Sequence, residues 1–245
     1  WQEASEDIFW FKKPTKILNK SNPPFYKWFE DGVTNTCYNA LDIHIDQGNG
    51  KRTALIYDSP ITGNKDKFTY EELRTKVSKF AGALVNQGVN QGDRVIIYMP
   101  MIPEAVIAML ACARIGAIHS VVFGGFASNE LASRIDDSKA KILITASCGF
   151  EPGRTVEYKP LVDEAVKQAN HKIQKMILFQ RSGHEVNLKE PDEISWDEAL
   201  LNAKETDCTE MNSNEFAYIL YTSGTTGTPK GIVRDLGGHI VALTW

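Results

Sequence analysis

The sequence is poor in cysteine and has no excess of positive charge, and both shortages exclude classes of protein. Only four cysteines occur in 245 residues, Cys37, Cys112, Cys148 and Cys208, and no two form a CxxC pair. So long and Cys-poor a chain does not fit a disulfide scaffold, and a reducing intracellular compartment suits it better. The 27 Lys and Arg against 31 Asp and Glu give a net charge of −4. Nucleic-acid modules usually carry a basic excess, so we expect no nucleic-acid partner.

Patterns for a metal site or a membrane span are also missing. The five histidines are dispersed, with no HExxH motif and no Cys/His cluster at zinc spacing, so we predict no protein-bound metal. Residues 105–127 carry one formal charge, at Arg114, and approach the roughly 20 apolar residues that a span needs. Pro103, Gly116 and the pair Gly124-Gly125 break this stretch, which favours a buried helix followed by a strand.

Apolar segments with strand and helix spacing alternate along most of the chain, which predicts an α/β domain with a mostly parallel sheet flanked by helices. The strongest helix signal is Thr69 followed by Glu72, a capping-box pattern; Ser128 and Ser195 are further expected caps. The expected strands are 53–57, 94–99, 117–123, 141–145, 176–179 and 215–222. The expected helices are 39–46, one after Thr69, 103–115, 128–138, 160–169 and 195–203.

Aromatic residues and prolines crowd the first 40 residues, which indicates an extended arm packed onto a domain. We divide the chain into an N-terminal extension at 1–48 and a main domain at 49–245. The acidic pair Asp136-Asp137 stands at a helix end, where we interpret it as a solvated face rather than a metal or acid–base site.

The most informative segment is the loop after the strand at 215–222. It combines hydroxyl side chains, glycines and one lysine, a set that suits a polyphosphate: glycine lets the backbone approach a ligand, exposed N–H groups bind anions, and lysine adds a positive charge. The alternatives are a polar surface loop and the GxxxxGK[ST] phosphate loop of nucleoside triphosphatases. The second fails because Gly231 follows Lys230 where Ser or Thr is required. The predicted ATP-binding residues are Thr222, Ser223, Gly224, Thr225, Thr226, Gly227, Thr228, Pro229, Lys230 and Gly231.

Three segments carry a resemblance to a known family. YTSGTTGTPKG resembles the signature of adenylate-forming enzymes, which include acyl-CoA synthetases, luciferases and peptide-synthetase adenylation domains. WFEDGVTNTCYNALDIHI is similar to the N-terminal extension of acetyl-CoA and propionyl-CoA synthetases, and IIYMPMIPEAVIAMLACARIGAIHSVVFGGFAS to their first core unit. The chain is identified as a member of this family over essentially its whole length.

The resemblance implies an ATP-dependent short-chain fatty acid–CoA ligase that works through an acyl-adenylate. ATP with Mg²⁺ and coenzyme A would be its co-substrates, and Lys230, as the catalytic residue, would contact the β and γ phosphates. The Arg234-led segment after the loop resembles propionyl-CoA synthetases more than acetyl-CoA synthetases, so propionate is favoured over acetate. The implied compartment is the mitochondrial matrix, with the cytosol as the alternative.

A second implied site is the turn Glu151, Pro152, Gly153 and Arg154, which matches a turn that contacts the nucleotide end of CoA in this family. Pro-Gly favours a turn, and arginine binds phosphate bidentately. From the residues alone an ordinary surface turn explains it as well. Acetyl-CoA synthetases usually carry a second arginine where Glu151 stands, so a grip by two arginines is not expected from this turn. The segment 123–126 would line the same region, although tight strand-end geometry explains its glycines equally well.

The chain begins at Trp1 without an initiator methionine and stops at Trp245 in mid-pattern. We therefore expect the N-terminal part of a large domain, with the C-terminal part of the same chain missing, apolar surface exposed where that part packs, and no activity of the fragment alone. The alternative is a non-catalytic nucleotide- or CoA-binding module derived from such an enzyme.

Overall fold

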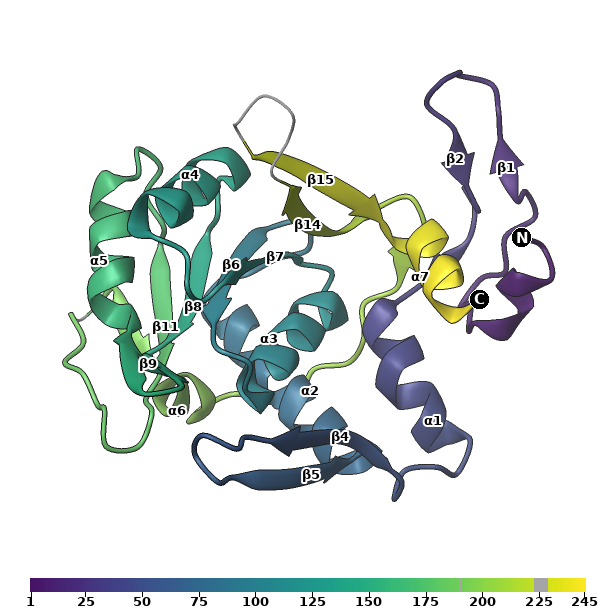
Figure 1. Cartoon of the computed structure of the whole chain (residues 1–245). Coiled ribbons are helices and arrows are strands. Elements are labelled where there is room, and N and C mark those ends of the chain that lie inside the picture. The colour runs from purple at the N-terminus through teal and green to yellow at the C-terminus, as the bar shows by residue number, and fades with distance from the viewer. Residues whose placement is uncertain (190, 223–228) are drawn as a thin grey trace.

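The computed structural model describes residues 1–189, 191–222 and 229–245. Its centre is a seven-stranded sheet in the order β12-β11-β8-β6-β7-β14-β15, parallel throughout except for the final pair β14–β15 (Figure 1). The strands of this sheet are β6 (Arg94–Met99), β7 (Ile118–Phe123), β8 (Ile142–Ala146), β11 (Lys175–Phe179), β12 (Glu193–Ser195), β14 (Phe216–Thr222) and β15 (Lys230–Asp235). The predicted mostly parallel α/β fold is confirmed.

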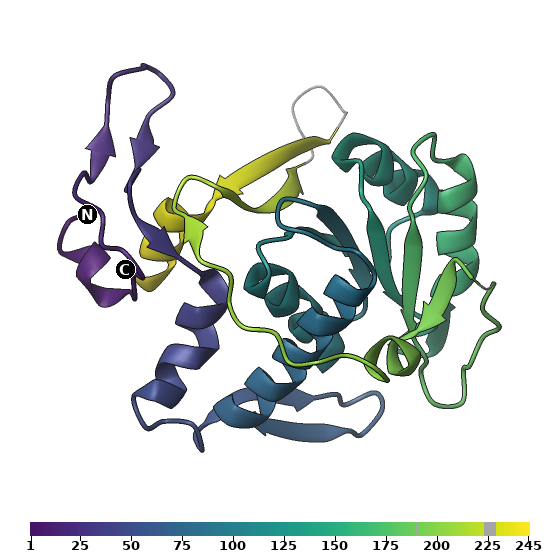
Figure 2. The same cartoon turned by 180° about the vertical axis from the view of Figure 1, so that it is seen from behind.

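Helices cover both faces of this sheet (Figures 1 and 2). On one side α2 packs against both α3 and α6, and on the other α4 packs against α5. The helices are α1 (Ile43–Asp46), α2 (Tyr70–Asn86), α3 (Pro103–Arg114), α4 (Ser128–Ser138), α5 (Tyr158–Gln168), α6 (Trp196–Leu200) and α7 (Leu236–Thr244), with a 3₁₀ turn at Ala4–Asp7 and a π-helical turn at Tyr38–Asp42. The apolar strands β6 and β8 are buried along almost their whole length because helices lie on either side.

Local capping signals explain where two helices begin. Thr69 accepts a hydrogen bond from the Glu72 N–H, while the Glu72 carboxylate accepts one from the Thr69 N–H, so the predicted capping box is present. Ser195 caps α6 through the Glu198 N–H. The prediction that Ser128 caps α4 is wrong. The helix begins at Ser128 itself, one residue earlier than predicted. The N-cap position with extended backbone is therefore held by Ala127, whose side chain cannot accept a hydrogen bond.

Several short strand pairs lie outside the large sheet. The small pairs are β1 (Leu18–Asn19) with β2 (Lys27–Trp28), β3 (Val33–Thr34) with β13 (Met211–Asn212), β4 (Thr53–Asp58) with β5 (Lys65–Thr69), and β9 (Cys148–Glu151) with β10 (Arg154–Glu157). The predicted strand at 53–57 therefore exists, but it pairs with β5 instead of joining the large sheet.

The N-terminal arm packs on the C-terminal helix. Trp10 and Phe29 are buried in a small second core with Leu236, Ile240 and Val241 of α7. The Trp1 and Trp245 rings lie 5.6 Å apart, so the two ends of the chain meet here (Figure 1). The β1–β2 hairpin of the arm projects away from the sheet, and Phe25 and Tyr26 near its tip are exposed.

One group of exposed apolar side chains lies on β7, β14, β15 and the C-terminal end of the chain. They are Val121, Phe123, Phe216, Leu220, Ile232, Val233, Leu243 and Trp245. Apolar surface is therefore exposed along this part of the sheet, whereas the expectation that a further part of the chain packs there stays a prediction. No helix within the described residues is long and apolar enough to cross a membrane.

Candidate functional site

The predicted phosphate loop connects β14 to β15 along the chain, and the structure describes only its two flanks. Thr222 and Lys230 are direct partners in the antiparallel register, and both are exposed. Ser223, Gly224, Thr225, Thr226, Gly227 and Thr228 lie outside the described residues. Because β14 runs parallel to β7 and β6, Thr222 ends its strand at the same edge of the sheet as Phe123 and Met99. Ligands of open α/β sheets bind at this carboxyl edge.

Helix α4 holds the base of the hairpin through Tyr221. The Tyr221 hydroxyl donates to Asp137 Oδ2 at 2.6 Å, and the Arg134 guanidinium carbon lies 5.2 Å from the centre of the Tyr221 ring. Burial and this hydrogen bond raise the pKa of Tyr221. These contacts fix the residue before Thr222 to the helix that begins after β7.

The two acidic residues at the end of α4, Asp136 and Asp137, make hydrogen bonds to different parts of the structure. Asp136 accepts the backbone N–H of His171 at 2.6 Å, a bond that lowers the pKa of Asp136. Asp137 is the acceptor for Tyr221. With different partners on different elements, the two carboxylates have the structural roles expected of an ordinary helix end.

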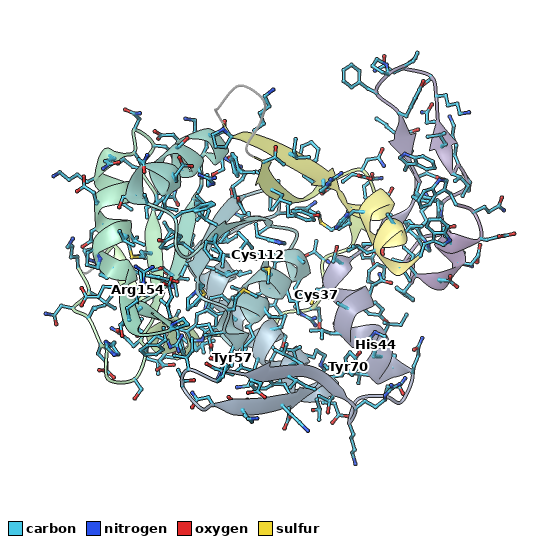
Figure 3. All side chains as sticks on the ribbon, viewed as in Figure 1. Cys37, His44, Tyr57, Tyr70, Cys112 and Arg154 are labelled. Atoms are coloured by element: carbon cyan, nitrogen blue, oxygen red, sulfur yellow. The ribbon has the colours of Figure 1, made fainter. Side chains whose placement is uncertain are left out.

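The predicted CoA turn is the turn of the β9–β10 hairpin. Gly153 has φ +75°, a conformation that glycine adopts without steric cost. Glu151 and Arg154 are cross-strand partners, and Arg154 donates from Nε to Glu151 Oε2 at 2.7 Å and from Nη2 at 2.6 Å. Arg154 lies on the side of the molecule away from the N-terminal arm (Figure 3). Its guanidinium is exposed but already engaged by a carboxylate.

Next to this hairpin is a cavity of about 320 Å³ at the carboxyl ends of β6 and β7, which we call the strand-end groove. Glu151 lines it together with Gly124, Gly125, Phe150 and Tyr158. The groove brings Phe123, Gly124 and Gly125 together with Glu151, whereas Phe126 of the predicted segment 123–126 is not in its lining, and CoA binding here stays a prediction. Arg154 and Lys230 are not among the residues that line it.

The Tyr158 side chain explains why residue 124 is a glycine. Tyr158 is 5% exposed, and burial raises its pKa to about 12. A Cβ atom at Gly124 would lie 2.8 Å from Tyr158 Cζ, and one at Gly149 would lie at the same distance from that atom. Two backbone segments therefore close on the Tyr158 ring, and glycine is required at both.

A second cavity, of about 260 Å³, is mainly apolar and lies between α3, β14 and α7. Two histidines and a tyrosine, His119, His239 and Tyr218, bring polar atoms to its lining. The Tyr218 hydroxyl lies 3.0 Å from His239 Nε2. Burial lowers the pKa of His119 to about 4, and its Nδ1 has no hydrogen-bond partner among the described residues. His119 is therefore neutral near pH 7.

Two distant cysteines meet in a cluster that sequence spacing did not reveal. Cys37 Sγ, an Asp42 oxygen and Cys208 Sγ lie within 4.8 Å of one another, a set able to ligate a metal. Arg114 Nη1 lies 2.8 Å from Asp42 Oδ2 and 3.5 Å from Cys37 Sγ. A hydrogen bond to Cys37 and burial raise the pKa of Cys208. Because Arg114 already supplies the positive charge opposite Asp42, we assign the cluster a structural role.

Comparison with known proteins defines the family. Residues 44–245 match the profile of the AMP-binding enzymes, and residues 1–40 match the N-terminal segment of acetyl-coenzyme A synthetases. The chain belongs to the AMP-binding enzyme family. This confirms the adenylate-forming resemblance, whereas the domain boundary at 48/49 stays a prediction.

Two curated relatives show the level of similarity. The mitochondrial acyl-CoA synthetase short-chain family member 3 of Homo sapiens is 53% identical to this chain over 246 residues. Acetyl-coenzyme A synthetase of Streptomyces coelicolor is 46% identical over the same length. Both alignments cover 100% of this chain, but only 36% and 38% of the relatives. The structure of acetoacetyl-CoA synthetase from Streptomyces lividans matches with a TM-score of 0.88 at 26% identity, over 100% of this chain and 37% of that one. The chain therefore spans little more than a third of these relatives.

Proposed function

We propose that these residues form the N-terminal part of an ATP-dependent short-chain carboxylate–CoA ligase. The carboxylate attacks the α-phosphorus of ATP and pyrophosphate leaves, giving an acyl-adenylate. The CoA thiol then attacks the acyl carbonyl, loses its proton, and AMP leaves with the bonding electrons. A carboxylate is a poor electrophile and AMP is a good leaving group, so the first step mainly needs positioning and charge stabilisation on the phosphates.

The pairing of Thr222 with Lys230 carries this proposal. It holds a hydroxyl and an ammonium group opposite each other at the carboxyl edge of the sheet, at the two ends of a hydroxyl- and glycine-rich segment. We assign Lys230 to the β and γ phosphates of ATP, which enters as its Mg²⁺ complex. We assign CoA to the strand-end groove beside the β9–β10 hairpin.

For the acyl substrate we propose propionate in preference to acetate. The support is the sequence around Arg234, whose side chain is exposed at the end of β15, and the 53% identity to mitochondrial short-chain family member 3. The same relative supports the mitochondrial matrix as the compartment, and the cytosol is the alternative because bacterial relatives are also similar.

Carboxylate-dependent exchange of labelled pyrophosphate into ATP tests the proposal. We expect the full-length protein to catalyse exchange faster with propionate than with acetate, and Lys230→Ala to impair it. We expect the 245-residue chain alone to catalyse none. Exchange by this chain at enzymatic rates would refute the inactivity of the fragment. A full-length protein that binds ATP and CoA but shows no exchange with short-chain carboxylates would favour the alternative, a non-catalytic binding module.

A further inference from the structure

Arg181 is a buried arginine held at the strand-end groove by contacts on both its backbone and its side chain. It follows β11, and only 9% of it is exposed. Its backbone N–H donates to Ser147 Oγ at 2.8 Å, and its guanidinium carbon lies 4.8 Å from the centre of the Phe150 ring on β9. The aromatic ring supports one face of the guanidinium and leaves its N–H edges free to donate.

The Arg181 guanidinium makes no ion pair and no side-chain hydrogen bond among the residues that the structure describes, and the one carboxyl whose pKa its charge lowers, Glu104, is held at a raised pKa by burial. The groove is lined by three charged side chains, Asp58, Glu151 and Arg181. Asp58 pairs with Lys65 at 3.0 Å, and Glu151 pairs with Arg154. No carboxylate, carbonyl or hydroxyl hydrogen-bonds the Arg181 guanidinium within the described ranges. Buried charges are normally paired, because their desolvation is costly, so an unpaired one at a cavity indicates an anionic ligand.

Space for that ligand lies on two sides of Arg181. The residue lines the strand-end groove, and it also lines an adjoining cavity of about 430 Å³. Thr62, Asn64 and Ser182 add neutral hydrogen-bonding groups to the second cavity, which contains no acidic residue in its lining. A phosphate is one of the anions that the planar donor fork of arginine binds bidentately.

We propose that Arg181 binds a phosphate of the nucleotide end of CoA. Arg154 is held by Glu151 on the adjacent hairpin, so among the described groove residues Arg181 is the cation without an ion pair. This assignment rests on the proposed CoA-dependent function, but the phosphate site itself does not depend on catalysis.

Calorimetric titration of the 245-residue chain with CoA, and separately with inorganic pyrophosphate, tests the proposal. We expect Arg181→Ala to weaken CoA binding on the order of tenfold or more, since a hydrogen-bonded charge pair is lost. Arg181→Lys keeps the charge but not the planar fork, and we expect an intermediate loss. Arg52→Ala removes the same charge from an exposed position outside the groove and should leave the affinity unchanged.

A second measurement avoids any effect of substitution on folding. Phenylglyoxal modifies accessible arginines, and we expect CoA to protect Arg181 of the unsubstituted chain, as read by peptide mass spectrometry.

Equal CoA affinity of the unsubstituted and Arg181→Ala chains, or modification of Arg181 unaffected by bound CoA, would overturn the proposal and leave the ligase function standing. Binding of pyrophosphate that depends on Arg181, without binding of CoA, would support the phosphate site and count against its CoA assignment. Binding of neither probe would overturn the proposal, while the exchange assay on the full-length protein still decides the ligase function.

Discussion

Arg114 at the end of α3 holds Asp42 with two hydrogen bonds, Nη1 to Oδ2 at 2.8 Å and Nη2 to Oδ1 at 3.0 Å. The Arg114 side chain is 3% exposed and that of Asp42 is 12% exposed. The pair fixes the segment that follows the N-terminal arm to the core of the α/β domain. Cys37 and Cys208 lie in the same cluster, so three separate parts of the chain meet at this ion pair.

Asp42→Asn should destabilise the chain by about 3–5 kcal/mol, because it leaves the buried guanidinium without its counter-charge. Urea denaturation measures this change in unfolding free energy. Glu6→Gln is the matched control, since it breaks an exposed ion pair with Lys13 and should cost no more than about 1 kcal/mol. Equal effects of the two substitutions would contradict the role given to Asp42.

The regular elements of the fold could be predicted from the sequence because their signals are local. The apolar run at β6 and the capping box at Thr69 each lie within a few residues, and both predictions are confirmed. The strand β15 was missed because only two consecutive apolar residues, Ile232 and Val233, lie between polar ends that resembled a continuation of the loop.

Contacts between distant residues lay beyond sequence reasoning. Cys37 and Cys208 meet only through the tertiary fold, so no spacing rule indicated them. Arg181 has no motif around it, and its importance comes from burial, the Phe150 ring and the missing partner, none of which a sequence displays. The turn of Glu151 and Arg154 was singled out through family resemblance, but the hairpin and the ion pair between the two residues were not foreseen.

His119 should make stability depend on pH. Burial lowers its pKa to about 4 in the folded chain, against 6.5 in the unfolded one. Between these values the unfolded state binds more protons, so the contribution is fully present above pH 6.5 and is lost as the pH falls toward 4. We expect a loss of about 2 kcal/mol between about pH 7 and pH 5, measured by urea denaturation at each pH. His119→Gln should remove most of this dependence. An unchanged pH profile in that variant would assign the effect to other groups, such as His239, whose pKa burial also lowers.

The two neighbouring glycines of the strand-end groove should respond differently to alanine. Gly124→Ala places a Cβ against the buried Tyr158 ring and should cost about 1–3 kcal/mol in unfolding free energy. Gly125→Ala is the matched control, because its Cβ meets only Phe123, whose ring is 66% exposed and free to move. Tyr158→Phe removes the hydroxyl, so Gly124→Ala should cost less in that background. Purely additive effects in the double variant would contradict the proposed clash.

Calorimetric titration of the 245-residue chain with ATP, before and after Lys230→Ala, tests the phosphate role of the β14–β15 loop most directly. Lys67→Ala, which removes an exposed lysine from another hairpin strand, serves as the control. If Lys230 contacts the β and γ phosphates, its replacement weakens ATP binding on the order of tenfold, while Lys67→Ala leaves the affinity unchanged. ATP affinity that is equal in the unsubstituted and Lys230→Ala chains would contradict that role.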